Sequence, residues 1–320
     1  MPTTRAPQSS NAEPYPANTP TQGGAVVGVD GSASADAAAQ WAAREAQRRE
    51  LPLTILHAIH LPDASAAPLE PHDYAQHRRA EGRGLLARAA AKVNARYPDL
   101  PVTTALSDHS PAHALEAASR TAALVVTGTR GRGGFAGMLL GSTSRALAAH
   151  TRCPLIVVPG EAPADAGQEV VLGVGAKHSE AAIRYAFEAA RSRSASLTVV
   201  RAWWPAPAAA GIAAPGGMYV IEPEVFRDAA TAETQTAIKA VREQFPDIAV
   251  RVETTEGNAV DLLLRAARRA NLLVVGAHRH RGPLAVGAGY VVDGVIAHSA
   301  VPVAVVPGRV DGTGAPVARA

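Results

Sequence analysis

A stretch of closely spaced glycines near the middle of the chain carries the residues best suited to bind a ligand. An apolar run at residues 124–127 ends at Gly128, and the sequence continues TRGRGGFAGMLLGSTS before a helical pattern begins. Glycine lets the backbone approach a ligand closely, and the unpaired N–H groups of a helix N-terminus favour phosphate. Ser142 and Thr143 add hydroxyl donors at that helix start. The order of strand, glycine loop and helix start predicts a phosphate-binding loop.

A carboxylate follows the first predicted strand. That strand ends in VVGVDGS, so Asp30, Gly31 and Ser32 stand at its carboxyl end, as Gly128 stands at the end of a later strand. Ligands of open parallel sheets bind beyond the carboxyl ends of the strands, so both loops are expected to line one crevice. Two alternatives stay open, because Asp30 and Ser142 are also residue types that cap helices.

The composition indicates a globular protein with more than one domain. The 320 residues are 47% hydrophobic and 18% charged, and the chain is long enough for two domains of about 150 residues. The net charge of +3 is small and the basic residues are scattered, which gives no reason to expect a nucleic-acid partner. No apolar run is long enough to span a bilayer. With Cys153 as the only cysteine, no intrachain disulfide can form, and we predict a cytoplasmic protein.

Strands and helices alternate along the first half of the chain. Strand patterns occur at residues 25–30, 53–60, 102–106, 124–127 and 154–158, and helical patterns occur at residues 36–50, 74–96 and 112–120. This alternation is typical of βαβ units and a parallel sheet.

The same order begins again after about 145 residues, which indicates a duplicated domain. VVLGVGAKHS repeats the first strand and its loop, SLTVVRAWW repeats the second strand, and VPVAVVP repeats the closing CPLIVVP. The predicted divisions are a disordered N-terminal tail at 1–22, a first domain at 23–160, a linker at 161–168, a second domain at 169–308 and a C-terminal tail at 309–320.

From residue 25 to residue 307 the chain resembles the universal stress protein family in its tandem two-domain form. The ATP-binding subgroup of that family is marked by Gly, two residues, Gly, nine residues, Gly and then Ser or Thr. Gly128 and Gly131, followed by nine residues and then Gly141 and Ser142, match this pattern completely. The resemblance implies two flavodoxin-like or Rossmann-like domains of the adenine nucleotide alpha hydrolase-like type. Each would be an open five-stranded parallel sheet with helices on both faces.

The resemblance also implies that the first domain binds ATP, with Mg²⁺ left open, and that the protein regulates stress response or dormancy. Asp30 would contact the ribose, the segment around Ile59 would border the adenine, and the glycine loop would hold the phosphates. Arg130 would add charge, unless it only solvates the loop. The implied ATP-binding residues are Asp30, Gly31, Ser32, Ile59, Gly128, Arg130, Gly131, Gly141, Ser142 and Thr143.

The second copy departs from this pattern. Gly175 stands in the place of Asp30, Arg279 in the place of Gly131, and Tyr290 in the place of Ser142. A side chain at 279 would hinder close backbone approach, and Tyr290 would crowd the phosphate donors. We therefore predict a degenerate site and a mainly structural role for the second domain, although the basic residues 278–281 could still attract an anion.

The sequence leaves three kinds of function open. The loop is not the GxxxxGK[ST] loop of Walker ATPases, and the sequence shows no catalytic or metal-ligating constellation, which favours a nucleotide-binding regulator over an enzyme. The alternatives are a slow ATPase or nucleotidyl-transfer enzyme, and an interaction scaffold that does not depend on ATP. The resemblance further implies pairing of the two domains through residues 154–158 and 302–306, and it leaves homodimerisation of whole chains open.

Overall fold

The computed structural model describes residues 22–61, 71–129, 131, 140–160, 167–204, 212–214, 217–219, 222–277 and 288–308. Arg130, Arg279, most of both predicted tails, most of the predicted linker and the basic residues 278–281 lie outside the described residues.

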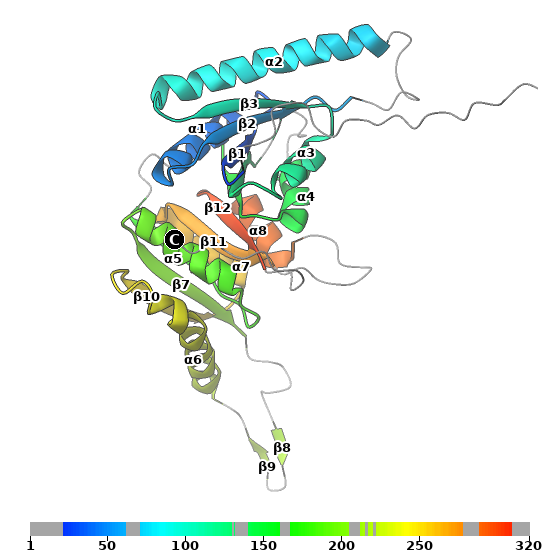
Figure 1. Ribbon diagram of the computed structural model, residues 1–320. Coiled ribbons are helices and arrows are strands. Elements are labelled where there is room, and N and C mark those ends of the chain that lie inside the picture. Colours follow the sequence, from blue (N-terminus) through cyan, green and yellow to red (C-terminus); the bar gives the residue numbers. More distant parts are fainter. Residues whose placement is uncertain are drawn as a thin grey trace, which may run out of the picture.

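Over its described residues, the first copy contains five parallel strands and four helices. Figure 1 shows how the elements are arranged. The strands are β1 (Ala25–Gly28), β2 (Leu53–Ala58), β3 (Val102–Ser107), β4 (Leu124–Gly128) and β5 (Leu155–Val158). The helices are α1 (Ala33–Arg48), α2 (Pro71–Arg96), α3 (Pro111–Ala118) and α4 (Ser142–His150). The predicted helix at 36–50 therefore begins three residues earlier, because Ser32 caps it: the Ser32 Oγ accepts a hydrogen bond from the Ala35 N–H.

The second copy repeats this order. Its strands in the main sheet are β6 (Glu169–Gly173), β7 (Ser196–Trp203), β10 (Val250–Glu256), β11 (Leu272–Ala277) and β12 (Val303–Pro307). Its helices are α5 (Glu180–Ser192), α6 (Pro223–Arg242), α7 (Ala259–Ala266), the 3₁₀ helix η3 (Ala267–Arg269) and α8 (Tyr290–His298). A small hairpin of β8 (Ile212–Ala214) and β9 (Gly217–Tyr219), which the sequence did not predict, lies between β7 and α6.

The ten long strands form one sheet in the order β10-β7-β6-β11-β12-β5-β4-β1-β2-β3. Each half is a parallel five-stranded sheet, as predicted. The halves join where β12 pairs antiparallel with β5, with Ala304 opposite Ile156. Because β5 and β12 run in opposite directions, the carboxyl ends of the strands in the two copies face opposite edges of the joint sheet.

Helices cover both faces of this sheet, and each face has its own apolar core. The first core joins residues of α1, α2, α5 and α6, including Trp41, Leu86, Phe187 and Ile238. The second joins residues of α3, α4, α7 and α8. The central strands are apolar runs such as LIVV in β5, because strands covered on both faces bury every side chain.

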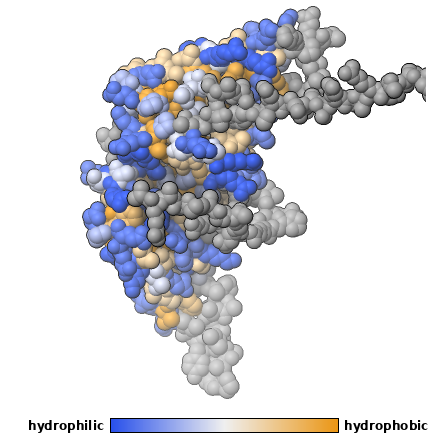
Figure 2. All heavy atoms as spheres, in the orientation of Figure 1, coloured by the Kyte–Doolittle hydropathy of each residue, from blue (hydrophilic) through white to orange (hydrophobic). Residues whose placement is uncertain are grey.

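The surface visible in Figure 2 is mostly hydrophilic, with smaller apolar areas between the polar ones. None of the helices in the described part of the chain combines the length and the apolar character needed to cross a lipid bilayer.

Candidate functional site

The candidate site of the first copy lies where the strand order reverses. The chain passes from β1 to β2 on one side and returns through β4 on the other, so β1 and β4 are neighbours whose carboxyl ends open between them. Such a reversal leaves a crevice at the carboxyl edge of an open sheet. Asp30 follows β1 by two residues and Gly128 ends β4, so the two predicted motifs meet there.

Asp30 does not cap α1. Its Oδ1 accepts a hydrogen bond from the Ser32 N–H at 3.0 Å, in a turn where Gly31 has a φ of +83°, a conformation that favours glycine. Ser32 is the N-cap residue instead, so its hydroxyl oxygen is already engaged. The helix-cap alternative for Asp30 is therefore wrong, and the predicted ligand residue Ser32 has a structural role.

The two signature glycines contact the end of β1 and the start of α1 closely. A Cβ at Gly131 would lie 2.5 Å from the Asp30 Oδ2, so the glycine loop and the Asp30 carboxylate are in direct contact. A Cβ at Gly128 would lie 2.9 Å from both the backbone C and O of Ser34, in the first turn of α1. The Ser34 Oγ is buried and has no hydrogen-bond partner among the described residues. No local pattern in the sequence marks Ser34, because only the fold brings it beneath Gly128.

Gly141 is the N-cap residue of α4 and has no side chain to cap it. The Gly141 N–H donates to the Thr129 carbonyl at 2.7 Å, which closes the loop at its base. Ser142 is the first helical residue and is exposed, and Thr143 is half-buried. The alternative that Ser142 caps α4 is therefore wrong as well.

Ser144 joins α4 to the end of β4. Its Oγ donates to the Gly128 carbonyl at 2.8 Å and lies 3.2 Å from the Thr127 Oγ1. The hydroxyl-rich run after Gly141 signalled this helix start, but not which of its hydroxyls would turn inward. Ser144 positions the helix start, and Ser142 and Thr143 remain nearer the solvent.

Ile59 lies just beyond β2, at the same edge of the sheet. Its side chain is buried, and a Cβ at Gly82 of α2 would lie 3.0 Å from the Ile59 Cγ2. The Ile59 N–H donates to the Ser107 carbonyl at 2.9 Å, and the Ile59 carbonyl accepts from the Arg78 Nη2 at 3.4 Å. Both backbone groups of Ile59 are thus hydrogen-bonded within the protein.

Histidine has a structural role at this edge. The His57 Nδ1 lies 2.7 Å from the Val29 carbonyl and donates to it, which ties β2 to the end of β1. Over the described ranges, no group of three or more His, Cys, Asp or Glu residues is arranged to hold a metal ion.

Cys153 is expected to be unreactive in the folded protein. The residue is 7% exposed, and burial raises the pKa of its thiol to about 12, so the nucleophilic thiolate is scarce at neutral pH. A maleimide should label native protein far more slowly than protein unfolded in urea, which should take up one equivalent. Rapid labelling of the native protein, at the rate of a free thiol, would contradict this prediction.

In the second copy the corresponding crevice holds an apolar cavity of about 170 Å³. Gly175 is exposed at its edge. The Tyr290 side chain is 74% exposed, and its hydroxyl accepts a hydrogen bond from the Asn258 Nδ2 at 3.4 Å. The aromatic ring therefore lies toward the N-terminus of α7, at the surface. Among the described residues that line this cavity, no carboxylate takes the place of Asp30.

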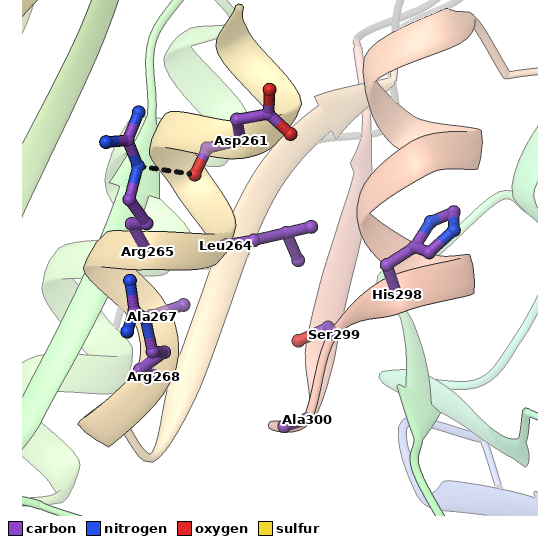
Figure 3. A pocket seen from close by; sticks show the side chains of 8 residues that line it. All are labelled: Asp261, Leu264, Arg265, Ala267, Arg268, His298, Ser299 and Ala300. Atoms are coloured by element: carbon purple, nitrogen blue, oxygen red, sulfur yellow. Dashed lines mark hydrogen bonds between the residues drawn. The ribbon is translucent and has the colours of Figure 1, made fainter.

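A second hollow of about 470 Å³ lies between α7 and α8 (Figure 3). Leu264 projects from α7 toward α8, whereas Arg265 points away and its Nε donates to the Asp261 carbonyl. His298, Ser299 and Ala300 form the other wall. Apart from Asp261 in the first turn of α7, these residues belong to the last turns of α7 and α8 and to the segments that follow them. The hollow shares no lining residue with the cavity of the second copy, although Leu263 of the same helix lines that cavity.

The sequence profile of the universal stress protein family matches residues 25–159 and again residues 168–307. The chain belongs to the universal stress protein family. Its two matched segments coincide with the two halves of the sheet, so this universal stress protein has the tandem form that the glycine spacing and the repeat predicted.

Full-length relatives support the same assignment. A universal stress protein of Mycolicibacterium smegmatis is 33% identical over 301 residues, covering 90% of this chain and 98% of the relative. One from Mycobacterium tuberculosis is 32% identical over 293 residues, covering 89% and 97%. The crystal structure of a universal stress protein from Archaeoglobus fulgidus shares the fold, with a TM-score of 0.65 at 17% identity, and covers 91% of this chain and 98% of its own.

Proposed function

We propose that the first copy binds ATP in the crevice between β1 and β4, and that the bound nucleotide regulates this protein in the cytoplasm during stress or dormancy. The observation that carries the proposal is the contact between Gly131 and the Asp30 carboxylate, two residues a hundred positions apart that belong to the two predicted motifs. A carboxylate beside a glycine loop offers an acceptor for ribose hydroxyls next to a backbone cradle for phosphates.

The residues of the crevice fit this ligand. Gly128 and Gly131 let the loop backbone lie directly against Ser34 and Asp30, where a Cβ would collide, and the start of α4 presents the N–H groups of Ser142 and Thr143 behind the N-cap Gly141. The buried Ser34 hydroxyl, which lacks a partner among the described residues, is a further group that a bound ligand or water would satisfy. Arg130 stays a proposed phosphate contact on the evidence of the sequence alone.

Asp30→Ala and Gly131→Ala are both expected to weaken ATP binding by about tenfold or more, since a charge-assisted hydrogen bond is worth about 1.5–3 kcal/mol. Asp30→Ala removes the acceptor. Gly131→Ala forces the Asp30 carboxylate to move, because its new Cβ would lie 2.5 Å from the Oδ2. Only a side-chain terminus must shift, so the free energy of unfolding of Gly131→Ala should lie within about 1 kcal/mol of the wild-type value. Titration calorimetry with ATP, with Mg²⁺ and with EDTA, measures the affinity and whether the metal contributes.

Gly175→Ala is the matched control, since it stands in the place of Asp30 in the second copy and its Cβ would meet the nearest atom, the Lys177 carbonyl oxygen, at 3.6 Å. It should leave ATP affinity unchanged, with one ATP bound per chain. Two ATP per chain, or full affinity in Asp30→Ala, would refute the proposal. Steady-state ATP hydrolysis well above background and lost in Asp30→Ala would favour the slow-ATPase alternative. Full cellular function in a variant that no longer binds ATP would favour the scaffold.

A further inference from the structure

The cavity of the second copy lies at the carboxyl edge of its half of the sheet, where β6 and β11 are neighbours. Its walls come from the ends of β6, β7 and β11 and from α5, α7 and α8. Open parallel sheets bind their ligands at this position. The place in the fold is that of a binding site, whereas the lining differs in character from the crevice of the first copy.

The lining contributed by the described residues is mostly apolar. Leu172, Ile183, Leu263, Val275 and Val292 are all buried in it. Three further valines, Ser179 and several alanines and glycines complete the described lining, and the polar side chains of Lys177 and His178 are exposed at the mouth. A nucleoside triphosphate would find no carboxylate for its ribose among the described lining residues, and bringing its charges against an apolar wall costs free energy. The chemistry of the lining therefore favours an uncharged, apolar ligand.

The size of the cavity sets the size of that ligand. Its volume of about 170 Å³ is comparable to that of an engineered apolar cavity of about 150 Å³ that stays dry and binds benzene. The cavity opens to solvent at its mouth, and the part of its apolar lining that faces this space lacks packing partners. A flat, mostly apolar molecule would supply those partners, and a single polar group on it would face the polar mouth at Lys177 and His178.

We propose that this cavity is a binding site for a small, uncharged apolar molecule between benzene and indole in size. The second copy is then a separate small-molecule site, opening at the opposite edge of the joint sheet from the proposed nucleotide crevice. The inference does not depend on ATP binding by the first copy, because the two sites share no residues.

Indole tests the proposal on the full-length chain. Titration calorimetry should show saturable binding of one indole per chain. Ala202→Leu fills the cavity from β7, and Ala259→Leu fills it independently from the first residue of α7. Each variant should weaken indole binding at least tenfold, while its ATP affinity stays that of wild type. Thermal unfolding of both variants shows which of them is folded, so one intact variant is enough for the test.

Ala58→Leu is the matched control, because Ala58 occupies in β2 the position that Ala202 occupies in β7. Ala58 lies five residues after Leu53, and Ala202 lies five residues after Leu197. These two leucines pair with equivalent positions of β1 and β6. It should leave indole binding unchanged. The proposal is overturned if wild type shows no saturable indole binding, if both filling variants fold and bind indole normally, or if AMP competes with indole for the cavity.

Discussion

Replacing Glu45 with Gln is expected to lower the free energy of unfolding by about 3–5 kcal/mol, the usual cost of removing one partner of a buried ion pair. Glu45 belongs to α1 of the first copy and is 1% exposed at its side chain. Its Oε2 lies 2.6 Å from the Nη2 of Arg193, which follows α5 in the second copy and is 4% exposed. Glutamine would leave the Arg193 guanidinium buried without a counter-charge, so the junction of the two copies should weaken.

The buried carboxylate is held by several arginines. The Arg49 Nε lies 2.6 Å from the Glu45 Oε1, and Arg48 also pairs with Glu45. Burial acts to raise the pKa of Glu45, but the charges of Arg193, Arg49 and Arg48 outweigh it and hold the pKa below its ordinary value of 4.5. For Arg193, burial lowers the pKa, yet a guanidinium stays protonated throughout the accessible pH range. The ion cluster is therefore charged at neutral pH.

The effect of Glu45→Gln should depend on pH. Because the folded-state pKa of Glu45 lies below the unfolded value, the carboxylate contributes its stability fully above about pH 4.5 and loses it as the pH falls through the lowered value. The difference in unfolding free energy between wild type and Glu45→Gln, measured by urea titration, should thus be largest near neutral pH and shrink on acidification. A difference that is constant from pH 7 to pH 3 would contradict this mechanism.

Two controls separate the buried charge from charge in general. Asp36→Asn removes the partner of Lys92 from a pair that is 40% and 59% exposed, and it should cost no more than about 1 kcal/mol. Glu45→Leu combined with Arg193→Leu should recover much of the loss seen in Glu45→Leu, since it removes the two most deeply buried charges of the cluster together. If the double variant is no more stable than the single one, the buried Arg193 charge is not the cause.

Gly128→Ala is expected to lower the free energy of unfolding by about 1–3 kcal/mol, the usual cost of overpacking. The added Cβ would lie 2.9 Å from the backbone C and O of Ser34, and backbone atoms cannot swing aside as a side-chain terminus can. The end of β4 and the start of α1 must separate. Because the Ser144 Oγ donates to the Gly128 carbonyl, the start of α4 should shift as well, and ATP binding should fall together with stability.

Gly160→Ala is the control for Gly128→Ala. Its Cβ would also approach Ser34, but at 3.8 Å from the Ser34 Cβ, which is an ordinary contact. Its free energy of unfolding should lie within about 0.5 kcal/mol of the wild-type value. Thermal unfolding of Gly128→Ala and Gly160→Ala measures this difference in stability. Gly131→Ala, by contrast, is expected to lose ligand binding and keep its stability. Equal melting of Gly128→Ala and wild type would show that β4 and α1 tolerate the wider spacing.

Much of the fold could be predicted because its signals are local. Apolar runs such as LIVV mark buried strands, the repeat of about 145 residues marks the duplication, and the spacing of Gly128, Gly131 and Gly141 marks the loop. Boundaries were less accurate where one side chain decides them, as Ser32 does at α1. That the loops at Asp30 and Gly128 line one crevice could be expected, since the carboxyl ends of parallel strands meet at one edge, whereas the contact of Asp30 with Gly131 is seen only in the structure.

What the sequence by itself determined is the tandem parallel-sheet fold, the family resemblance and the residues most suited to hold a nucleotide. Only the tertiary structure decided which hydroxyls hydrogen-bond to neighbouring elements, as that of Ser144 does to Gly128. It also decided that Glu45 meets Arg193 across the two copies, and that the crevice of the second copy is an apolar cavity. The physical reason is the same in each case. Burial and pairing depend on residues distant in sequence, and a local pattern shows a residue's type without showing which partner the packed chain will bring to it.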